Sequence, residues 1–97
     1  MPKAYWVTIY HTISDTEKLA AYAALAGPAI EACGGKYLAR GSTNIAYEAG
    51  GTERAVICAF ESIDAAIKAH DSQGYKKALD ALGNAAFRDV RIIEGLE

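Results

Sequence analysis

The chain has 97 residues, of which 52% are hydrophobic and 23% are charged, and its formal net charge is −2. This composition is that of a folded globular protein, and the length allows one domain, residues 1–97, with a modest core of its own. Binding along a phosphate backbone needs clustered Lys and Arg. Because the ten basic residues are scattered along the sequence, we expect no nucleic-acid partner.

Neither the N-terminal residues nor the apolar stretch that follows the first strand indicates a membrane protein. Met1-Pro2-Lys3 runs directly into strand-like sequence, without the apolar core of a signal peptide. The Ala-rich stretch from Leu19 to Cys33 is interrupted by Gly27, Pro28 and Glu31 and is too short to span a bilayer. We therefore expect a cytoplasmic protein with no membrane partner.

The two cysteines do not indicate a metal site. Neither Cys33 nor Cys58 has a Cys or His at zinc-ligand spacing. Both are interpreted as reduced packing residues, because a free cysteine behaves as a small apolar side chain. The sequence predicts no metal and no cofactor.

Residues 4–12, AYWVTIYHT, predict the first strand, because they are rich in aromatic and β-branched side chains. By alternation, Trp6, Thr8 and Tyr10 share one face of this strand, and the residues between them share the other. Both faces are largely apolar, so each face of the strand is expected to be covered.

The segment SDTE that follows predicts the start of a helix. Ser14 is expected to be the N-cap, with Glu17 reaching back to it in a capping box. An apolar stripe continues the helical period beyond this turn. Pro28 lies within the stripe and is expected to kink the helix or to divide it.

The segment GGKYLARG, residues 34–41, has the glycines of a phosphate-binding loop, but its position between a helix and a strand is the reverse of what such a loop requires. Such a loop gathers backbone N–H groups at the start of a helix. Here the glycines follow a helix and lead into a strand, so Gly34-Gly35 is interpreted as the helix C-cap. Residues 36–41 and 54–61 predict the second and third strands, joined by an exposed loop.

The last third of the chain repeats the pattern of helix and strand. Ser62 is expected to cap a second helix, which DSQG at residues 71–74 breaks or bends before the helical period resumes at Tyr75. RDVRIIEG, residues 88–95, predicts the last strand. The element order predicts an α+β, ferredoxin-like βαββαβ fold, with a four-stranded antiparallel sheet and the helices on one face.

Helices on one face leave the other face of the sheet bare. We expect the bare face to carry Trp6, Thr8, Tyr10, Leu38, Arg40 and Ile57. An exposed apolar patch of this size predicts a partner surface. A second copy pressed sheet to sheet would cover it, so we expect a homodimer in which Trp6 and Tyr10 are interface aromatics.

The segments AYWV, GGKYLARG, RAVICAFES, DSQGY and VRIIEG occur in the order found in a family of small bacterial proteins. Over essentially its whole length, the sequence resembles the family known as domain of unknown function 1330, within the dimeric α/β-barrel superfamily. The resemblance implies a dimeric α/β barrel made of two ferredoxin-like subunits. Because the superfamily includes small monooxygenases, isomerases and haem-binding proteins, it implies no one chemistry.

The chain departs from the pattern of this family at several polar positions. Ala59 stands where the family tends to have an acidic residue, His70 where it often has a tyrosine, and Leu82 where a basic residue is frequent. The helix break, commonly Ser-Pro-Glu-Tyr, is SQGY at residues 72–75. These departures weaken the case for a polar site built from those groups.

Aromatic walls with a few polar groups are typical of small-molecule pockets, and the candidate ligand-binding residues are Trp6, Tyr10, Arg40, His70 and Tyr75. Arg40 is interpreted as pairing with a carboxylate or carbonyl group, with ligand contact and simple exposure as alternatives. His70 is interpreted as a packed residue near the apolar stripe of its helix, and Tyr75 as a core residue. His70 and Arg40 are the candidates for catalysis, since imidazole titrates near neutrality.

Two functions stay open at this point. The first is an enzyme or binding protein for a small organic molecule, held in a pocket lined by aromatic residues, Arg40 and His70. The alternative is a non-catalytic dimeric interaction or structural module whose barrel is filled by side chains. No Ser-His-Asp set, carboxylate pair or metal-ligand cluster decides whether the protein is an enzyme.

Overall fold

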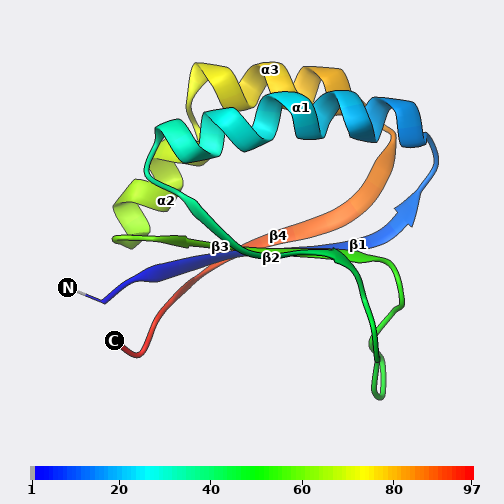
Figure 1. Cartoon of the computed structure of the whole chain (residues 1–97), viewed down its shortest axis with the longest axis horizontal. Coiled ribbons are helices and arrows are strands. Elements are labelled where there is room, and N and C mark those ends of the chain that lie inside the picture. The colour runs from blue at the N-terminus through cyan, green and yellow to red at the C-terminus, as the bar shows by residue number, and fades with distance from the viewer. Residues whose placement is uncertain (1) are drawn as a thin grey trace.

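The computed structural model describes residues 2–97 and shows one sheet with helices over one of its faces (Figure 1). The elements in chain order are β1 (Ala4–Ile13), α1 (Thr16–Ala32), β2 (Lys36–Ser42), β3 (Arg54–Phe60), α2 (Ile63–His70), α3 (Gln73–Leu82) and β4 (Ala86–Glu94). The antiparallel strands lie in the order β2-β3-β1-β4. The predicted ferredoxin-like fold is confirmed, with the second helix in two parts. None of the helices described is long and apolar enough to cross a membrane.

The N-cap of α1 differs from the prediction. Asp15 caps the helix, and its carboxylate accepts hydrogen bonds of 3.1 Å from the backbone N–H groups of Glu17 and Lys18. Ser14 instead donates from its hydroxyl to the carbonyl of Ala85 at 3.1 Å, which ties the end of β1 to the start of β4. The predicted capping box at Ser14 is therefore wrong, because a tertiary contact takes the Ser14 hydroxyl.

The rest of α1 tests two further predictions. The helix is not divided at Pro28 but runs on to Ala32. Its end is as predicted, because Gly34 has a φ of +89° and the N–H of Gly35 donates to the carbonyl of Ile30 at 2.9 Å. This is the hydrogen bond of a Schellman C-cap, which a residue with positive φ permits.

Trp6, Thr8 and Tyr10 lie on the helix-covered face of the sheet, contrary to the prediction. Their side chains are buried, with exposed fractions of 1%, 3% and 3%. Val56 pairs with Thr8 on one side and with Arg40 on the other, so Arg40 is on the helix-covered face as well. The assignment of these residues to the open face, and of Trp6 and Tyr10 to a subunit interface, is therefore wrong.

The open face carries the alternate side chains of the same strands. Ile57 pairs with Val7 and lies on this face, as expected. The large apolar side chains that β1 and β4 leave exposed here are Ile9, Phe87 and Ile93, with exposed fractions of 37%, 69% and 53%. Leu38, also exposed, lies at an irregularity in the pairing of β2 with β3.

Large aromatic side chains fill the space between the helices and the sheet. The ring of Trp6 lies edge-on to that of Tyr75, with centroids 5.0 Å apart, and is stacked with Phe60 at 6.1 Å. The Nε1–H of Trp6 donates to Oγ1 of Thr8 at 2.9 Å, so the buried indole N–H is satisfied within its own strand. The packing is not complete, and a small cavity remains beneath α1.

Candidate functional site

A small cavity lies between the helix-covered face of the sheet and α1. Its empty volume is about 410 Å³ including the space open to solvent, of which about 30 Å³ accepts the centre of a water molecule. As the side chains stand, this room suits one or two waters or a ligand of a few heavy atoms. The lining residues are Trp6, Thr8, Tyr10, Leu19, Tyr22, Ala23, Ala26, Ile30, Tyr37, Arg40, Arg54, Val56, Cys58 and Arg88.

Arg88 is the central polar group of this cavity. It pairs with Tyr10 across the β1–β4 ladder, which directs it to the helix-covered face. Its Nη1 donates to the hydroxyl oxygens of Tyr10 and Tyr22 at 3.2 and 3.0 Å, and its Nη2 donates to that of Tyr75 at 3.1 Å. The hydroxyls of Tyr22 and Tyr75 are themselves hydrogen-bonded at 2.8 Å. One guanidinium group thus joins three tyrosines from three elements.

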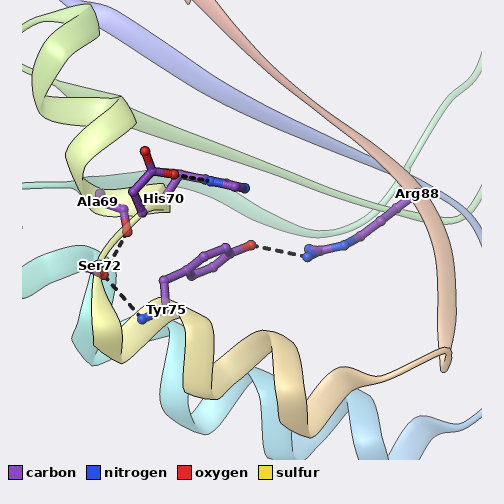
Figure 2. A network of polar contacts seen from close by, with 6 residues as sticks. Ala69, His70, Ser72, Tyr75 and Arg88 are labelled. Carbon is purple, nitrogen blue, oxygen red and sulfur yellow. Dashed lines mark hydrogen bonds and ion pairs between the residues drawn. The ribbon is translucent and has the colours of Figure 1, made fainter.

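The break between α2 and α3 positions Tyr75 in this cluster (Figure 2). The Ser72 hydroxyl donates to the carbonyl of Ala69 at 2.8 Å and accepts from the backbone N–H of Tyr75 at 3.2 Å. Ser72 therefore ends one helix and caps the next. From the first turn of α3, the Tyr75 ring points toward Arg88 (Figure 2).

The ionisation states of the cluster follow from burial and from these contacts. Burial raises the pKa of Tyr10 and that of Tyr22, so both phenols are neutral at physiological pH. Burial by itself would lower the pKa of Arg88, but its interactions with Tyr22 and Tyr75 outweigh burial and raise that pKa. The cluster therefore carries one full positive charge.

Two further arginines belong to the cavity wall. Arg40 is exposed at the rim, with its guanidinium carbon 4.4 Å from the centroid of the Tyr37 ring. Arg54, from the next strand, is half-buried. In the described part of the chain, ion pairs join only His11 or Arg91 to Asp89, and His70 to Asp71. The arginines of the cavity thus have no carboxylate partner there.

The cavity wall holds no group with the properties of a nucleophile or a general base. Burial raises the pKa of the Cys58 thiol to about 11 and that of the Tyr37 hydroxyl to about 12, so both are protonated near neutrality. Among the described lining residues there is no Asp, Glu or His. The described residues also include no group of three His, Cys, Asp or Glu side chains placed to hold a metal ion.

The structure brings together some of the predicted site residues and separates others. Trp6, Tyr10 and Arg40 all line the cavity, and Tyr75 reaches it through its hydrogen bond to Arg88. His70 does not line it. The imidazole lies 5.6 Å from the ring of Trp6, with its Nδ1 3.1 Å from a carboxylate oxygen of Asp71, and its side chain is 43% exposed.

Sequence reasoning missed the residue at the centre of the site. Arg88, Val90 and Ile92 alternate along β4 and therefore share one strand face. A single charge on an otherwise apolar face is the pattern that could have indicated Arg88 as a site residue. Tyr22 has no such signal, because its ring fits the apolar stripe of its helix. Arg54 is the first residue of the predicted third strand, where a charge is unremarkable. Only the folded chain brings these distant positions to one cavity.

Comparison with solved structures supports the same fold. A protein of unknown function from Rhodopseudomonas palustris has a TM-score of 0.76 and 17% identity, and the match covers 99% of this chain and 84% of that one. A dimeric ferredoxin-like protein of unknown function from Thermobifida fusca has a TM-score of 0.66 and 18% identity, with 96% and 91% of the chains covered. SnoaB, a cofactor-independent oxygenase from Streptomyces nogalater, has a TM-score of 0.63 and 14% identity, with 100% and 96% covered.

The sequence comparisons give a family but no characterised relative. No curated protein matches the chain. The family model described as domain of unknown function 1330 matches residues 3–96, which is nearly the whole chain. The protein therefore belongs to the domain of unknown function 1330 family.

Proposed function

We propose that the protein binds a small organic molecule in the cavity between the sheet and α1. The observation that carries this proposal is the composition of the cavity wall. The rings of Tyr10 and Tyr22 adjoin the guanidinium group of Arg88, and the ring of Trp6 lines the same cavity. Apolar walls with a few fixed polar groups are typical of small-molecule sites, because the walls supply affinity and the polar groups fix orientation.

A thermal-shift experiment with a panel of small anionic, neutral and cationic organic molecules tests this proposal. A ligand of the folded state raises the melting temperature as its concentration exceeds the dissociation constant. The variant Ala23→Leu, which adds volume to the cavity wall, is expected to abolish the shift. The matched control is Ala24→Leu, at the next position of α1, which is exposed and does not line the cavity. If no compound of any charge class stabilises the wild-type protein, the proposal fails.

We propose further that the protein is a cytoplasmic homodimer joined through the open sheet face. Ile9, Phe87 and Ile93 are exposed apolar side chains on this face, and a second copy would bury them. The polar cluster of His11, Asp89 and Arg91 lies among them. The loop between β2 and β3 extends from the sheet on the side away from the helices (Figure 1), with Ile45 and Tyr47 71% and 78% exposed. The similarity to a dimeric ferredoxin-like protein and the two free cysteines are consistent with this assembly and location.

Sedimentation analysis at micromolar concentration tests the dimer. The wild-type protein is expected to sediment as a dimer and Ile9→Glu as a folded monomer. The new carboxylate would lie opposite Asp89 across the β1–β4 ladder, and a dimer would bury these two like charges together. Leu25→Glu, at a 43% exposed position of α1, is the matched control and is expected to stay dimeric. A monomeric wild-type protein would reject the assembly, while ligand binding to the cavity would be tested separately.

A further inference from the structure

The cavity has an excess of positive charge. Arg40, Arg54 and Arg88 come from three different strands to one wall, and none of the described lining residues is acidic. Like charges gathered around one small space repel each other, and the partial burial of Arg54 and Arg88 adds a cost because neither has a carboxylate counterion among the described residues. An anion held in the cavity would relieve both effects.

The cavity also has an excess of hydrogen-bond donors. A guanidinium group has five N–H donors. The three bonds to tyrosine oxygens occupy two on Nη1 and one on Nη2, which leaves the Nε–H and one Nη2–H of Arg88 without a described partner. Among the described residues, every side-chain nitrogen or oxygen that is fully buried has a hydrogen-bond partner. The Nε atom of Arg88 has no such partner, so it is not fully buried and a ligand can reach it.

The tyrosine hydroxyls add to this excess. The oxygen of Tyr10 accepts from Arg88, so its O–H proton is free to donate, and no acceptor for it is among the described contacts. Tyr22 and Tyr75 share one hydrogen bond, so one of their two protons is also left over. A negatively charged ligand with several lone pairs can accept hydrogen bonds from these free donors of Arg88 and the tyrosines. A ligand that mainly donates hydrogen bonds, such as a protonated amine, cannot.

The remaining wall and the available room define the rest of the ligand. Leu19, Ile30 and Val56 give the wall an apolar side, and the space for the centre of a water molecule is about 30 Å³. We propose that the natural ligand is a small organic monocarboxylate, whose carboxylate accepts from Arg88 and Tyr10 while a short apolar body lies against these aliphatic side chains. This inference rests on the proposed function and names its ligand class.

Butyrate and butyramide are the probes, because they have nearly the same shape and differ in charge and in the number of acceptors. Isothermal titration and thermal shift are measured on the full chain at neutral pH, with sodium chloride matching the ionic strength. Butyrate is expected to bind and to raise the melting temperature, while butyramide has little effect. Arg88→Met is expected to weaken butyrate binding by about 10- to 100-fold, because hydrogen bonds to a charged group are lost.

Two further variants keep the test decisive. Arg91→Met removes an arginine from the same strand, but one that is 71% exposed and paired with Asp89, and it is expected to bind butyrate like the wild type. If Arg88→Met does not fold, Tyr10→Phe serves in its place. It keeps the ring and removes one donor, and about tenfold weaker binding is expected.

The outcomes separate this inference from the proposed function. Equal binding of butyramide and butyrate, or unchanged butyrate binding in both Arg88→Met and Tyr10→Phe, would overturn the carboxylate class and leave a binding site in the cavity. Binding of inorganic phosphate without binding of butyrate would overturn it as well, in favour of an inorganic anion. If the wild-type protein binds none of the anionic, neutral and cationic compounds of the wider panel, the proposed function itself is rejected.

Discussion

Gly35 lies where the end of α1 meets the core, and replacing it by alanine is expected to overpack that point. A Cβ atom there would lie 2.7 Å from Cζ of Phe60 and 2.9 Å from its Cε1, and it would also contact Cγ2 of Ile30. Carbon atoms normally approach to about 3.5–4.0 Å. Phe60 and Ile30 are only 2% and 3% exposed, so neither can move into solvent.

The expected cost of Gly35→Ala is about 1–3 kcal/mol, the usual range for inserting volume into a packed core. For a chain of this length, that corresponds to a melting temperature lower by roughly 5–20 °C. Thermal unfolding followed by far-ultraviolet circular dichroism measures the change. All variants are compared at one protein concentration, because association would make the melting temperature depend on concentration.

Gly27→Ala is the matched control for this prediction. Gly27 is inside α1, and a Cβ atom added to it would have no heavy atom within 4 Å apart from its chain neighbours and its own helix backbone. Alanine is therefore expected to stabilise the helix by about 0.5–1 kcal/mol. The steric reasoning is refuted if Gly35→Ala melts with the wild type, or if both alanine variants are destabilised equally.

The remaining predictions concern two buried groups. The pKa of the Cys58 thiol is raised from 9.0 to about 11 in the folded protein, so the stability linked to its proton is complete below pH 9 and is lost as the pH rises through 11. The wild type should have a higher free energy of unfolding than Cys58→Ala below pH 9, and this difference should shrink by about 2–3 kcal/mol as the pH rises from 9 to 11. A difference that does not change with pH would contradict this prediction. Thr8→Val removes the acceptor of the buried Trp6 N–H, 2.9 Å away, and is expected to cost about 1–3 kcal/mol in chemical denaturation. A variant as stable as the wild type would show that the indole finds another partner.

Which face of the sheet is covered could not be read from the first strand. Trp6 and Tyr10 alternate with Val7 and Ile9, and both sets are apolar. Alternation establishes which residues share a face, but either set could lie under the helices. In the structure, the face with the larger rings is the one under the helices, where Trp6 of the sheet packs against Tyr75 of α3.

The candidate site was predictable in kind but not in its central residue. Trp6, Tyr10 and Arg40 were proposed from their residue types, and all three line the cavity. His70 was proposed from the titration range of imidazole, yet its position at the C-terminal end of α2 leaves it half-exposed beside Asp71. Arg88 could not be singled out because its partners are tyrosines from three other elements, and two of these partners, Tyr10 and Tyr22, are 78 and 66 residues away in the sequence.

The elements and their order could be predicted from the residues alone, because period, caps and breaks are local properties. The glycines at positions 34 and 35 end α1, and Ser72 separates α2 from α3, as their residue types require. The meeting of three arginines at one cavity, and the phenol partners of Arg88, became visible only in the folded chain. That arrangement depends on strand register and on the covered face, which are set by packing between distant segments and not by any local pattern.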